Sequence, residues 1–417
     1  MAERTNRNWP LRILTLILVL GIIGFGIVVA IQRRVVHDAG PVVTTAQGSF
    51  YKAPKHLPSG QPGAIIRSRP HAVPASTGAP KGTTARAILY TSRDFRTGKP
   101  IAVSGVVYLP PPGRVPAGGR PIIAWAHGTS GIASPCAPSL ESAPSQPGFS
   151  RFLQQGWVVV TTDYRGLGTE GPHQYLIGPQ AGHEVLDSVR AARRLPGSNA
   201  SDRVIIWGHS QGGQSVLFAG NQASSYAPEL QVLGLAAAAP AVKLRQLLEL
   251  DAGRLTGQLF VSLVLWSWSH SQPGAKLTGI VPEPGMKLVN SIAGRCFSAA
   301  NLTEDLPAAK EEQLFGTINI DQLSRDPVWS KLVAESTPSL PGVGPPMLIA
   351  QGTEDRVVAP QSTAEVAASL CKHGRRVESV VMNGVDHADA GESAAPRVFS
   401  WAKGLFDRQA PPSNCPS

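Results

Sequence analysis

The chain has 417 residues, of which 42% are hydrophobic and 16% are charged, a composition that excludes an intrinsically disordered protein. Its formal net charge is +10, but the basic residues are dispersed and form only short pairs such as Arg193-Arg194. A nucleic-acid partner is therefore not expected, because binding to a phosphate backbone requires clustered Lys and Arg.

The first element in chain order is an almost unbroken apolar run over residues 11–31. Its length suits a helix that crosses the hydrocarbon core of a bilayer, and the arginines before it place residues 1–10 on the cytoplasmic side. We interpret 11–31 as a transmembrane signal anchor, with a cleaved signal peptide as the alternative. In both cases the chain meets the membrane through this segment, and the remainder is expected to be extracytoplasmic.

Residues 32–80 are rich in Pro, Gly and small side chains without a sustained period, which predicts a linker and a loosely structured N-terminal arm. The pattern changes at residue 81. Short apolar or alternating runs over 85–91 and 101–109 flank a polar turn and predict a β-hairpin.

Continuously apolar runs then recur, as in strands that are covered on both faces. They occupy residues 122–125, 157–162, 204–207, 233–238, 347–350 and 377–382. Helical patterns lie between several of them, over 180–194, 212–224 and 362–373. The alternation predicts an α/β fold with a mostly parallel sheet and helices on both faces, built from residues 81–240 and 345–417.

Residues 241–344 interrupt this rhythm, because they are too many for one crossover and contain no clear strand. Helical patterns cover 244–250, 255–266 and 305–314, and Trp266 and Trp268 look exposed. We interpret the interval as an inserted helical cap, or lid subdomain, over the end of the sheet.

The sequence Gly208-His209-Ser210-Gln211-Gly212 fits the pattern G-x-S-x-G between a predicted strand and a predicted helix. That context is typical of a nucleophile elbow, a strained turn that lifts a serine hydroxyl to the carboxyl edge of the sheet. The glycines are needed because side chains two residues from the serine would clash with the tight backbone. Ser210 is therefore the predicted nucleophile; the alternative is an ordinary glycine-rich loop.

A serine needs an imidazole to accept its proton and an acid to orient that imidazole, and in this fold the order is Ser, acid, His. His387 follows the last strand in a loop at the carboxyl edge, which favours it over His373 at the end of a helix. Asp355 follows the strand at 347–350. We prefer it to Glu354, which would point to solvent, and to Asp386, which is adjacent to its own histidine.

The oxyanion of an acyl-transfer intermediate needs backbone N–H donors. One donor is expected from Gln211 and the second from Gly128 or Thr129, in the loop after the strand at 122–125. His127 in that loop is interpreted as support rather than as a catalytic base. Residues 163–168, which follow the strand at 157–162, are interpreted as pocket wall and loop rigidity, and no direct catalytic role is expected for Asp163.

The chain has four cysteines, Cys136, Cys296, Cys371 and Cys415. An even number in an exported chain predicts two disulfides, and three connectivities remain open. No pair has metal-ligand spacing such as CxxC, so a zinc site is not expected. The chemistry predicted for Ser210 requires neither a metal nor an organic cofactor.

Several blocks in one order resemble the secretory lipase family of fungi and actinobacteria, within the α/β-hydrolase superfamily. They are residues 50–51, 63–67, 127–131, 163–168, 186–192, 208–213, 352–355 and 386–387. The resemblance implies an acyl-ester hydrolase with a helical lid over an acyl-binding tunnel and the triad Ser210, Asp355, His387. It also implies that Cys136 pairs with Cys296 and Cys371 with Cys415.

These observations predict a carboxylic ester hydrolase or lipase that degrades lipid esters such as acylglycerols through an acyl-enzyme. One alternative keeps the triad and changes the acceptor, giving an acyltransferase or a peptidase. The other is a catalytically dead lipid-binding protein of the cell envelope, which the intact order of Ser, Asp and His disfavours.

Overall fold

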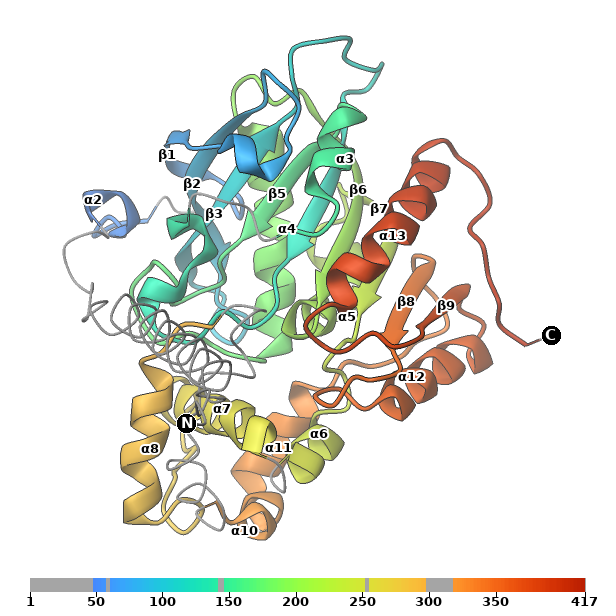
Figure 1. Cartoon of the computed structure of the whole chain (residues 1–417). Helices are drawn as coiled ribbons and strands as arrows, with labels where there is room; N and C mark the ends of the chain where they lie inside the picture. Colours follow the sequence, from blue (N-terminus) through green and yellow to red (C-terminus); the bar gives the residue numbers. More distant parts are fainter. Residues whose placement is uncertain (1–47, 58–60, 142–145, 252–254, 298–317, 417) are drawn as a thin grey trace, which may run out of the picture. The chain divides into compact units, whose positions relative to one another are not determined.

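The computed structural model describes residues 48–57, 61–141, 146–251, 255–297 and 318–416 (Figure 1). The chain divides at residue 48, and the fold belongs to the unit formed by residues 49–417. The predicted membrane segment 11–31 and the predicted helix at 305–314 lie outside the described residues. Among the helices of the described ranges, none combines the length and the hydropathy that crossing a bilayer requires.

A nine-stranded sheet forms the centre of the fold, with the strand order β1-β2-β3-β5-β4-β6-β7-β8-β9. The strands are β1 (Ile65–His71), β2 (Thr84–Arg93), β3 (Pro100–Leu109), β4 (Arg120–Ala126), β5 (Val158–Thr162), β6 (Ala200–His209), β7 (Gln231–Ala238), β8 (Met347–Gly352) and β9 (Val377–Met382). Pairing is antiparallel from β1 to β5 and parallel from β5 to β9. The predicted hairpin and all six predicted apolar strands are thereby confirmed.

Strand β1 corrects the prediction that the whole of 32–80 is a linker and loose arm. It pairs with β2 over the register from Ile65 to His71 and is the outermost strand on that side of the sheet. Its side chains are only partly buried or exposed, and it contains Pro70, which an edge strand tolerates. An edge strand buries too little to need an apolar run, so the sequence carried no signal for it.

Helices cover both faces of the sheet (Figure 1). Alternate residues of β4 and β6 point to opposite faces, as the period of a strand requires. Ile122 and Val204 belong to the core with α4 (Gly178–Arg194), α5 (Gln211–Tyr226) and α12 (Pro360–Lys372), whereas Ile123 and Trp207 belong to the core with α3 (Phe149–Gln154) and α13 (Ala390–Phe406). The predicted helices at 180–194, 212–224 and 362–373 are confirmed; α3 and α13 were not predicted.

Between β7 and β8 the chain forms a group of helices, here called the cap helices. They are α6 (Leu244–Asp251), α7 (Leu255–Ser271), α8 (Glu283–Ala293), α10 (Ile320–Arg325) and α11 (Pro327–Glu335). Figure 1 shows them gathered beyond one end of the strands. The remaining short helical elements are α2 (Gly48–Tyr51), η1 (Ala75–Thr77), η2 (Ser134–Cys136) and η3 (Pro138–Leu140).

The expectation that Trp268 is exposed is wrong. Its side chain is fully buried, its ring stacks on that of Trp329 with 5.8 Å between centroids, and its Nε1 donates to the carbonyl of Tyr175. Helix α7 carries apolar side chains around its whole circumference, so it is buried on several sides rather than on one stripe. Trp266 is half-buried and stacks on His270.

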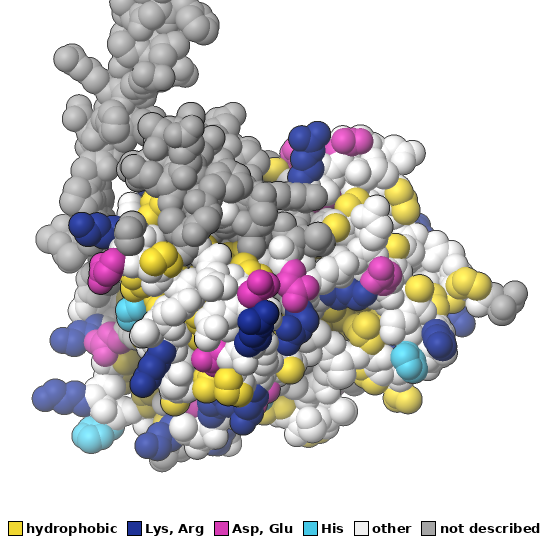
Figure 2. Space-filling view, turned by 90° about the horizontal axis from the view of Figure 1, so that it is seen from below, with side chains coloured by type: hydrophobic (Ala, Val, Ile, Leu, Met, Phe, Trp, Pro, Cys, Tyr) yellow, Lys and Arg dark blue, Asp and Glu magenta, His cyan; other side chains and the backbone are white. Residues whose placement is uncertain are grey.

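The visible surface carries charges of both signs. Figure 2 shows Lys and Arg side chains interspersed with Asp and Glu on the face seen from below. This mixture agrees with the dispersed basic residues of the sequence.

Candidate active site

Ser210 lies at the turn between β6 and α5, with backbone angles φ 55° and ψ −117° that a non-glycine residue adopts only under strain. The motif glycines make this turn possible. A Cβ at Gly212 would lie 1.9 Å from the carbonyl oxygen of Ala126, and one at Gly208 would lie 2.5 Å from the carbonyl oxygen of Gly212. Glycine at both positions therefore lets the turn close on itself and pack tightly against the neighbouring strand β4. The turn presents Ser210 at the carboxyl edge of the sheet.

Three predicted residues from three separate loops meet at this edge. The hydroxyl of Ser210 lies 2.9 Å from Nε2 of His387, and Nδ1 of His387 lies 2.8 Å from Oδ2 of Asp355. All three side chains are buried, with Ser210 7% exposed and His387 5% exposed. The arrangement has the geometry in which an imidazole accepts a proton from a serine while a carboxylate fixes its tautomer.

Asp355 is held by four hydrogen bonds. The backbone N–H groups of Val357 and Val358 donate to Oδ1, whereas Gln351 Nε2 and His387 Nδ1 donate to Oδ2. Burial raises the pKa of this carboxyl, but the hydrogen bond and charge of His387, together with the other donors, lower it below its ordinary value. Asp355 is therefore a carboxylate at neutral pH.

The candidates that were not preferred lie elsewhere. His373 is exposed at the end of α12, where its Nδ1 is hydrogen-bonded to the carbonyl of Ser369. Glu354 is exposed, and Asp386 is exposed and accepts a hydrogen bond from the N–H of Asp389. The structure brings neither carboxylate to the imidazole of His387.

The predicted oxyanion donors flank the serine. A Cβ at Gly128 would lie 3.8 Å from the Cβ of Ser210, so the loop that follows β4 passes beside the hydroxyl. Gln211 is the first residue of α5. Within the described part of the chain, the N–H groups of Gln211 and Thr129 donate to no backbone carbonyl, which leaves both available to an oxyanion.

His127 and Asp163 lie behind this loop. His127 is buried, and its ring nitrogens contact the carbonyl oxygens of Gly128 and Asp163 at 2.6 and 3.3 Å, as expected of a supporting residue. Asp163 accepts hydrogen bonds from the hydroxyls of Ser104 and Ser139 and from the N–H of Ser139. Asp163 is fully buried, and these contacts agree with the expected loop rigidity. No residue of 163–168 lines either of the described cavities that contain Ser210.

A residue inside the motif contributes a contact that the sequence analysis missed. His209 lies beside His387, with 4.9 Å between the ring centroids, and its Nε2 is 2.9 Å from the carbonyl oxygen of His387. Burial and the neighbouring His387 lower the pKa of His209 to about 3, so its ring is neutral and Nε2–H donates. The signal was its place in the motif, which puts it one residue from the serine.

Comparison with known proteins settles the family. The family model described as secretory lipase matches residues 148–414. The chain belongs to the secretory lipase family. It is 22% identical over 388 residues to Lipase A of Moesziomyces aphidis, a match that covers 88% of this chain and 81% of that one.

Two further matches bear on the fold and on the activity of this family. A Mycobacterium tuberculosis protein named a probable inactive lipase is 25% identical over 86% of this chain and 81% of its own length. The crystal structure of Candida antarctica lipase A in its closed state superposes with a TM-score of 0.73 at 19% identity, covering 89% of both chains. The structural match shows the α/β-hydrolase fold, and membership of the family supports an ester hydrolase. The Mycobacterium tuberculosis relative, named as inactive, shows that membership alone does not guarantee activity.

In this member of the family, Ser210 lines two of the cavities formed by the described residues. One, of about 200 Å³, has a mixed wall in which the loop Gly128–Ser130, His387 and Glu392 alternate with apolar side chains such as Phe297. The other, of about 30 Å³, has an apolar wall that includes Leu247 and Val264 of the cap helices. An ester bound at Ser210 would therefore have an apolar environment on one side and a mixed one on the other.

The chain has two disulfides, with the pairing that the resemblance implies. Cys136–Cys296 joins the loop beyond β4 to the chain that follows α8, and Cys371–Cys415 joins α12 to the C-terminal segment. Both indicate an extracytoplasmic protein, in agreement with a secretory family. Among the described residues, no three His, Cys, Asp or Glu side chains are grouped closely enough to hold a metal ion.

Proposed function

We propose that this protein is a serine ester hydrolase that cleaves acyl esters of lipids, with Ser210 as nucleophile, His387 as general base and acid, and Asp355 as the residue that orients His387. The observation that carries the proposal is the unbroken hydrogen-bonded series from the Ser210 hydroxyl through both nitrogens of His387 to Asp355. A binding protein has no need of that series.

The reaction proceeds in two steps. Oγ of Ser210 attacks the ester carbonyl carbon while His387 Nε2 takes the hydroxyl proton, and the oxyanion accepts hydrogen bonds from the N–H groups of Gln211 and of Thr129 or Gly128. His387 then gives its proton to the leaving alcohol, which leaves an acyl-enzyme. Water attacks this ester with His387 as base, the carboxylic acid departs, and Ser210 regains its proton. Neither a metal nor an organic cofactor takes part in this mechanism.

The two cavities support a lipid ester as substrate. The wall of the cavity under α6 and α7 suits the acyl chain in chemistry, because it consists mainly of Leu, Val and Phe side chains. The cavity of about 200 Å³, whose mixed wall includes the loop Gly128–Ser130 and Glu392, suits the alcohol portion. In this proposal residues 241–344 act as the lid that the resemblance implies, and residues 11–31 either anchor the enzyme outside the cytoplasm or are removed on export.

The test compares wild type with Ser210→Ala and with the control Ser224→Ala. Ser224 is an exposed serine near the end of α5, the helix that follows Ser210. Wild type and Ser224→Ala should hydrolyse p-nitrophenyl octanoate and be labelled by a fluorophosphonate, because both retain the nucleophile. Ser210→Ala should do neither; activity above roughly 1% of wild type would refute the assignment, since loss of a triad member costs far more. An unlabelled wild type would instead indicate a dead binding protein.

Acyl transfer is distinguished from hydrolysis by the fate of the acyl group. Wild type is incubated with the same ester in water and with increasing glycerol, and free acid and acylglycerol are quantified. A hydrolase yields mainly free acid at low glycerol. Acylglycerol as the main product there would establish a transferase with the same triad.

A further inference from the structure

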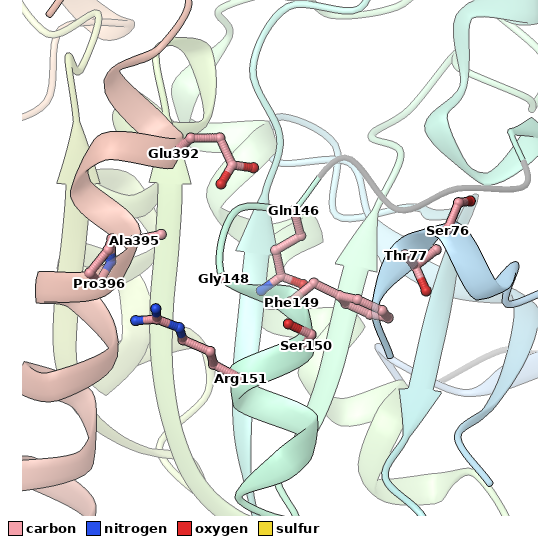
Figure 3. Close-up of a pocket in the computed structure, with 10 residues that line it drawn as sticks. All are labelled: Ser76, Thr77, Gln146, Gly148, Phe149, Ser150, Arg151, Glu392, Ala395 and Pro396. Atoms are coloured by element: carbon pink, nitrogen blue, oxygen red, sulfur yellow. The ribbon is translucent and has the colours of Figure 1, made fainter. Parts of the chain in front are cut away.

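A third cavity, larger than the two at Ser210, lies beside them. Its volume is about 430 Å³, against about 200 Å³ for the larger cavity at Ser210. Three separate parts of the chain line it, namely η1, the start of α3 with the residues that lead into it, and the first turns of α13 (Figure 3). A cavity of this size holds a group as large as a sugar or a small polyol.

This cavity adjoins the cavity of about 200 Å³ at Ser210. Glu392 lines both of them, and its neighbour Gly391 lines the one at Ser210. Pro147 lines the cavity at Ser210, whereas its chain neighbours Gln146 and Gly148 line the larger cavity. The two spaces are thus separated by one short segment and one helical turn, and an ester at Ser210 can extend its alcohol portion past Glu392.

The wall of the large cavity contains the buried amide of Gln146. Gln146 is 3% exposed, and among the described residues neither Oε1 nor Nε2 has a hydrogen-bond partner. Figure 3 shows its side chain in the middle of the lining residues, between Glu392 on α13 and Thr77 on η1. A buried amide left unsatisfied costs free energy, and a ligand that both accepts from Nε2 and donates to Oε1 would remove that cost. A hydroxyl group does both.

The other lining groups select the class of ligand. They include the hydroxyls of Ser76 and Ser150, the guanidinium of Arg151, the carboxylate of Glu392 and the ring of Phe149. One cation and one anion cancel, so the wall favours a neutral ligand over an ion. Several donors and acceptors around one aromatic ring suit a molecule that carries many hydroxyls on a carbon frame.

We propose that this cavity binds the hydroxyl-rich alcohol portion, a sugar or a polyol, of the ester whose carbonyl is attacked by Ser210. The inference rests on the proposed function and extends it to the substrate class. The acyl chain then lies under the cap helices, and the hydroxylated group lies between α3 and α13.

The first test compares octanoyl glucose and monooctanoylglycerol with ethyl octanoate, which shares the acyl chain and has no further hydroxyl. Gln146→Leu should lower kcat/KM for the hydroxylated esters about tenfold more than for ethyl octanoate, the effect of about one lost hydrogen bond. Gln155→Leu, an exposed glutamine just beyond α3, should not alter the ratio. A selective loss with the glucose ester alone identifies a sugar, and one with both esters identifies a polyol in general.

A second variant fills the cavity without touching Gln146. Ser76 is exposed and lines the cavity, whereas Ala75 is exposed in the same turn and does not line it. Ser76→Trp should lower kcat/KM for the hydroxylated esters at least tenfold relative to ethyl octanoate, and Ala75→Trp should leave the ratio unchanged. Equal losses on all three esters, or none, in both Gln146→Leu and Ser76→Trp would overturn the inference.

A binding measurement separates failure of this inference from failure of the proposed function. Ser210→Ala protein is titrated with octyl glucoside, 1-O-octylglycerol and octan-1-ol, none of which is an ester. Tighter binding of a hydroxylated compound than of octan-1-ol, lost about tenfold on adding Gln146→Leu, supports the cavity even if no ester is hydrolysed. Equal affinity for all three compounds contradicts it even if ethyl octanoate is hydrolysed.

Discussion

The catalytic edge of the sheet and the cap helices are held together by different forces. At the edge, backbone atoms approach so closely that a Cβ at Gly212 would lie 1.9 Å from Ala126, and Asp355 is fixed by four hydrogen bonds. In the cap, helix α7 is held by burial of apolar side chains, Val261 and Leu265 among those that are fully buried. Direction and distance matter at the edge, whereas volume and hydropathy matter in the cap.

The difference indicates that the catalytic edge and the cap helices serve separate functions. Polar contacts that fix atoms at hydrogen-bond distance suit the reacting groups, while apolar packing tolerates changes of similar volume and can vary with the substrate. One polar series joins the two regions: Trp268 Nε1 on α7 donates to the carbonyl of Tyr175, and the Tyr175 hydroxyl is hydrogen-bonded to Thr129 at 2.8 Å. Changes at the edge should therefore alter rate, and changes in the cap should alter selectivity.

The largest effect is expected from a single change at the edge. Asp355→Asn keeps the shape of the side chain but presents an NH₂ group where Gln351 Nε2 and His387 Nδ1 now donate to Oδ2. The wrong tautomer of His387 is then favoured, and kcat/KM for p-nitrophenyl octanoate should fall by about 10³- to 10⁴-fold. Glu354→Gln, the exposed neighbour, should retain wild-type kinetics; a loss below tenfold in Asp355→Asn would show that Asp355 does not orient the base.

Removing the disulfides tests how the cap is joined to the catalytic edge, because Cys136–Cys296 connects the two regions and Cys371–Cys415 does not. Removing Cys136–Cys296 with two serines opens a link of 160 residues, against 44 for Cys371–Cys415. In the chain-entropy model each loss costs about 2–5 kcal/mol, with the longer loop about 1 kcal/mol more costly. Denaturant unfolding measures both.

Kinetics at a temperature where both disulfide variants remain folded complete that comparison. Only the variant without Cys136–Cys296 should also lose kcat/KM. This disulfide lies near the loop that carries the oxyanion donors, because Phe297, next to Cys296, donates its N–H to the carbonyl of Ser130. Equal kinetics in the two variants would mean that the link stabilises the fold and does not position the edge.

A buried carboxyl beneath the edge makes stability depend on pH. Glu184 on α4 accepts hydrogen bonds from Gln180 Nε2 and from the N–H of Arg165, and burial raises its pKa to about 7. Folding therefore raises proton affinity, so the stabilisation is complete below the unfolded pKa of about 4.3 and is lost as pH rises through 7. The free energy of unfolding should fall by about 2 kcal/mol from this group between pH 5 and 7.5.

Urea unfolding at several pH values measures this dependence in wild type, Glu184→Gln and the exposed control Glu354→Gln. The slope should be reduced in Glu184→Gln because a glutamine does not titrate in this range, and it should persist in the control. A slope identical in all three proteins would place the titrating group elsewhere.

The smallest effect is expected in the cap, on selectivity. Val264 on α7 lines the apolar cavity at Ser210, so Val264→Phe should shorten the space for the acyl chain. The ratio of kcat/KM for p-nitrophenyl octanoate to that for p-nitrophenyl acetate should fall about tenfold, as expected for losing the burial of roughly two methylene groups. Val289→Phe, a buried valine of α8, controls for general overpacking and should leave the ratio unchanged. A ratio altered equally by both variants would locate the acyl chain outside this cavity.

Much of the fold could be predicted from local signals. The buried strands carry continuous apolar runs such as Val158–Thr162, and these runs alternate with helical patterns, which is enough to indicate a parallel sheet. The edge strand β1 carries a weak local signal because it buries little of its surface. Helix α3 carries a weak signal because its six residues are too few to show a helical period, although Phe149, Phe152 and Leu153 are buried.

The sequence by itself determined which residues compete for the site. Chain order along a parallel sheet puts the loops after β6, β8 and β9 at one edge, so Ser210, Asp355 and His387 could be selected before any distance was known. Only the tertiary structure decided which histidine meets the serine, which carboxylate meets that histidine, and that Trp268 is buried. It also showed that the amide of Gln146, without a hydrogen-bond partner among the described residues, lines a cavity near Ser210. The physical reason is that these contacts join residues far apart in the chain, and a local pattern records the period and polarity of a segment but not the surface it meets.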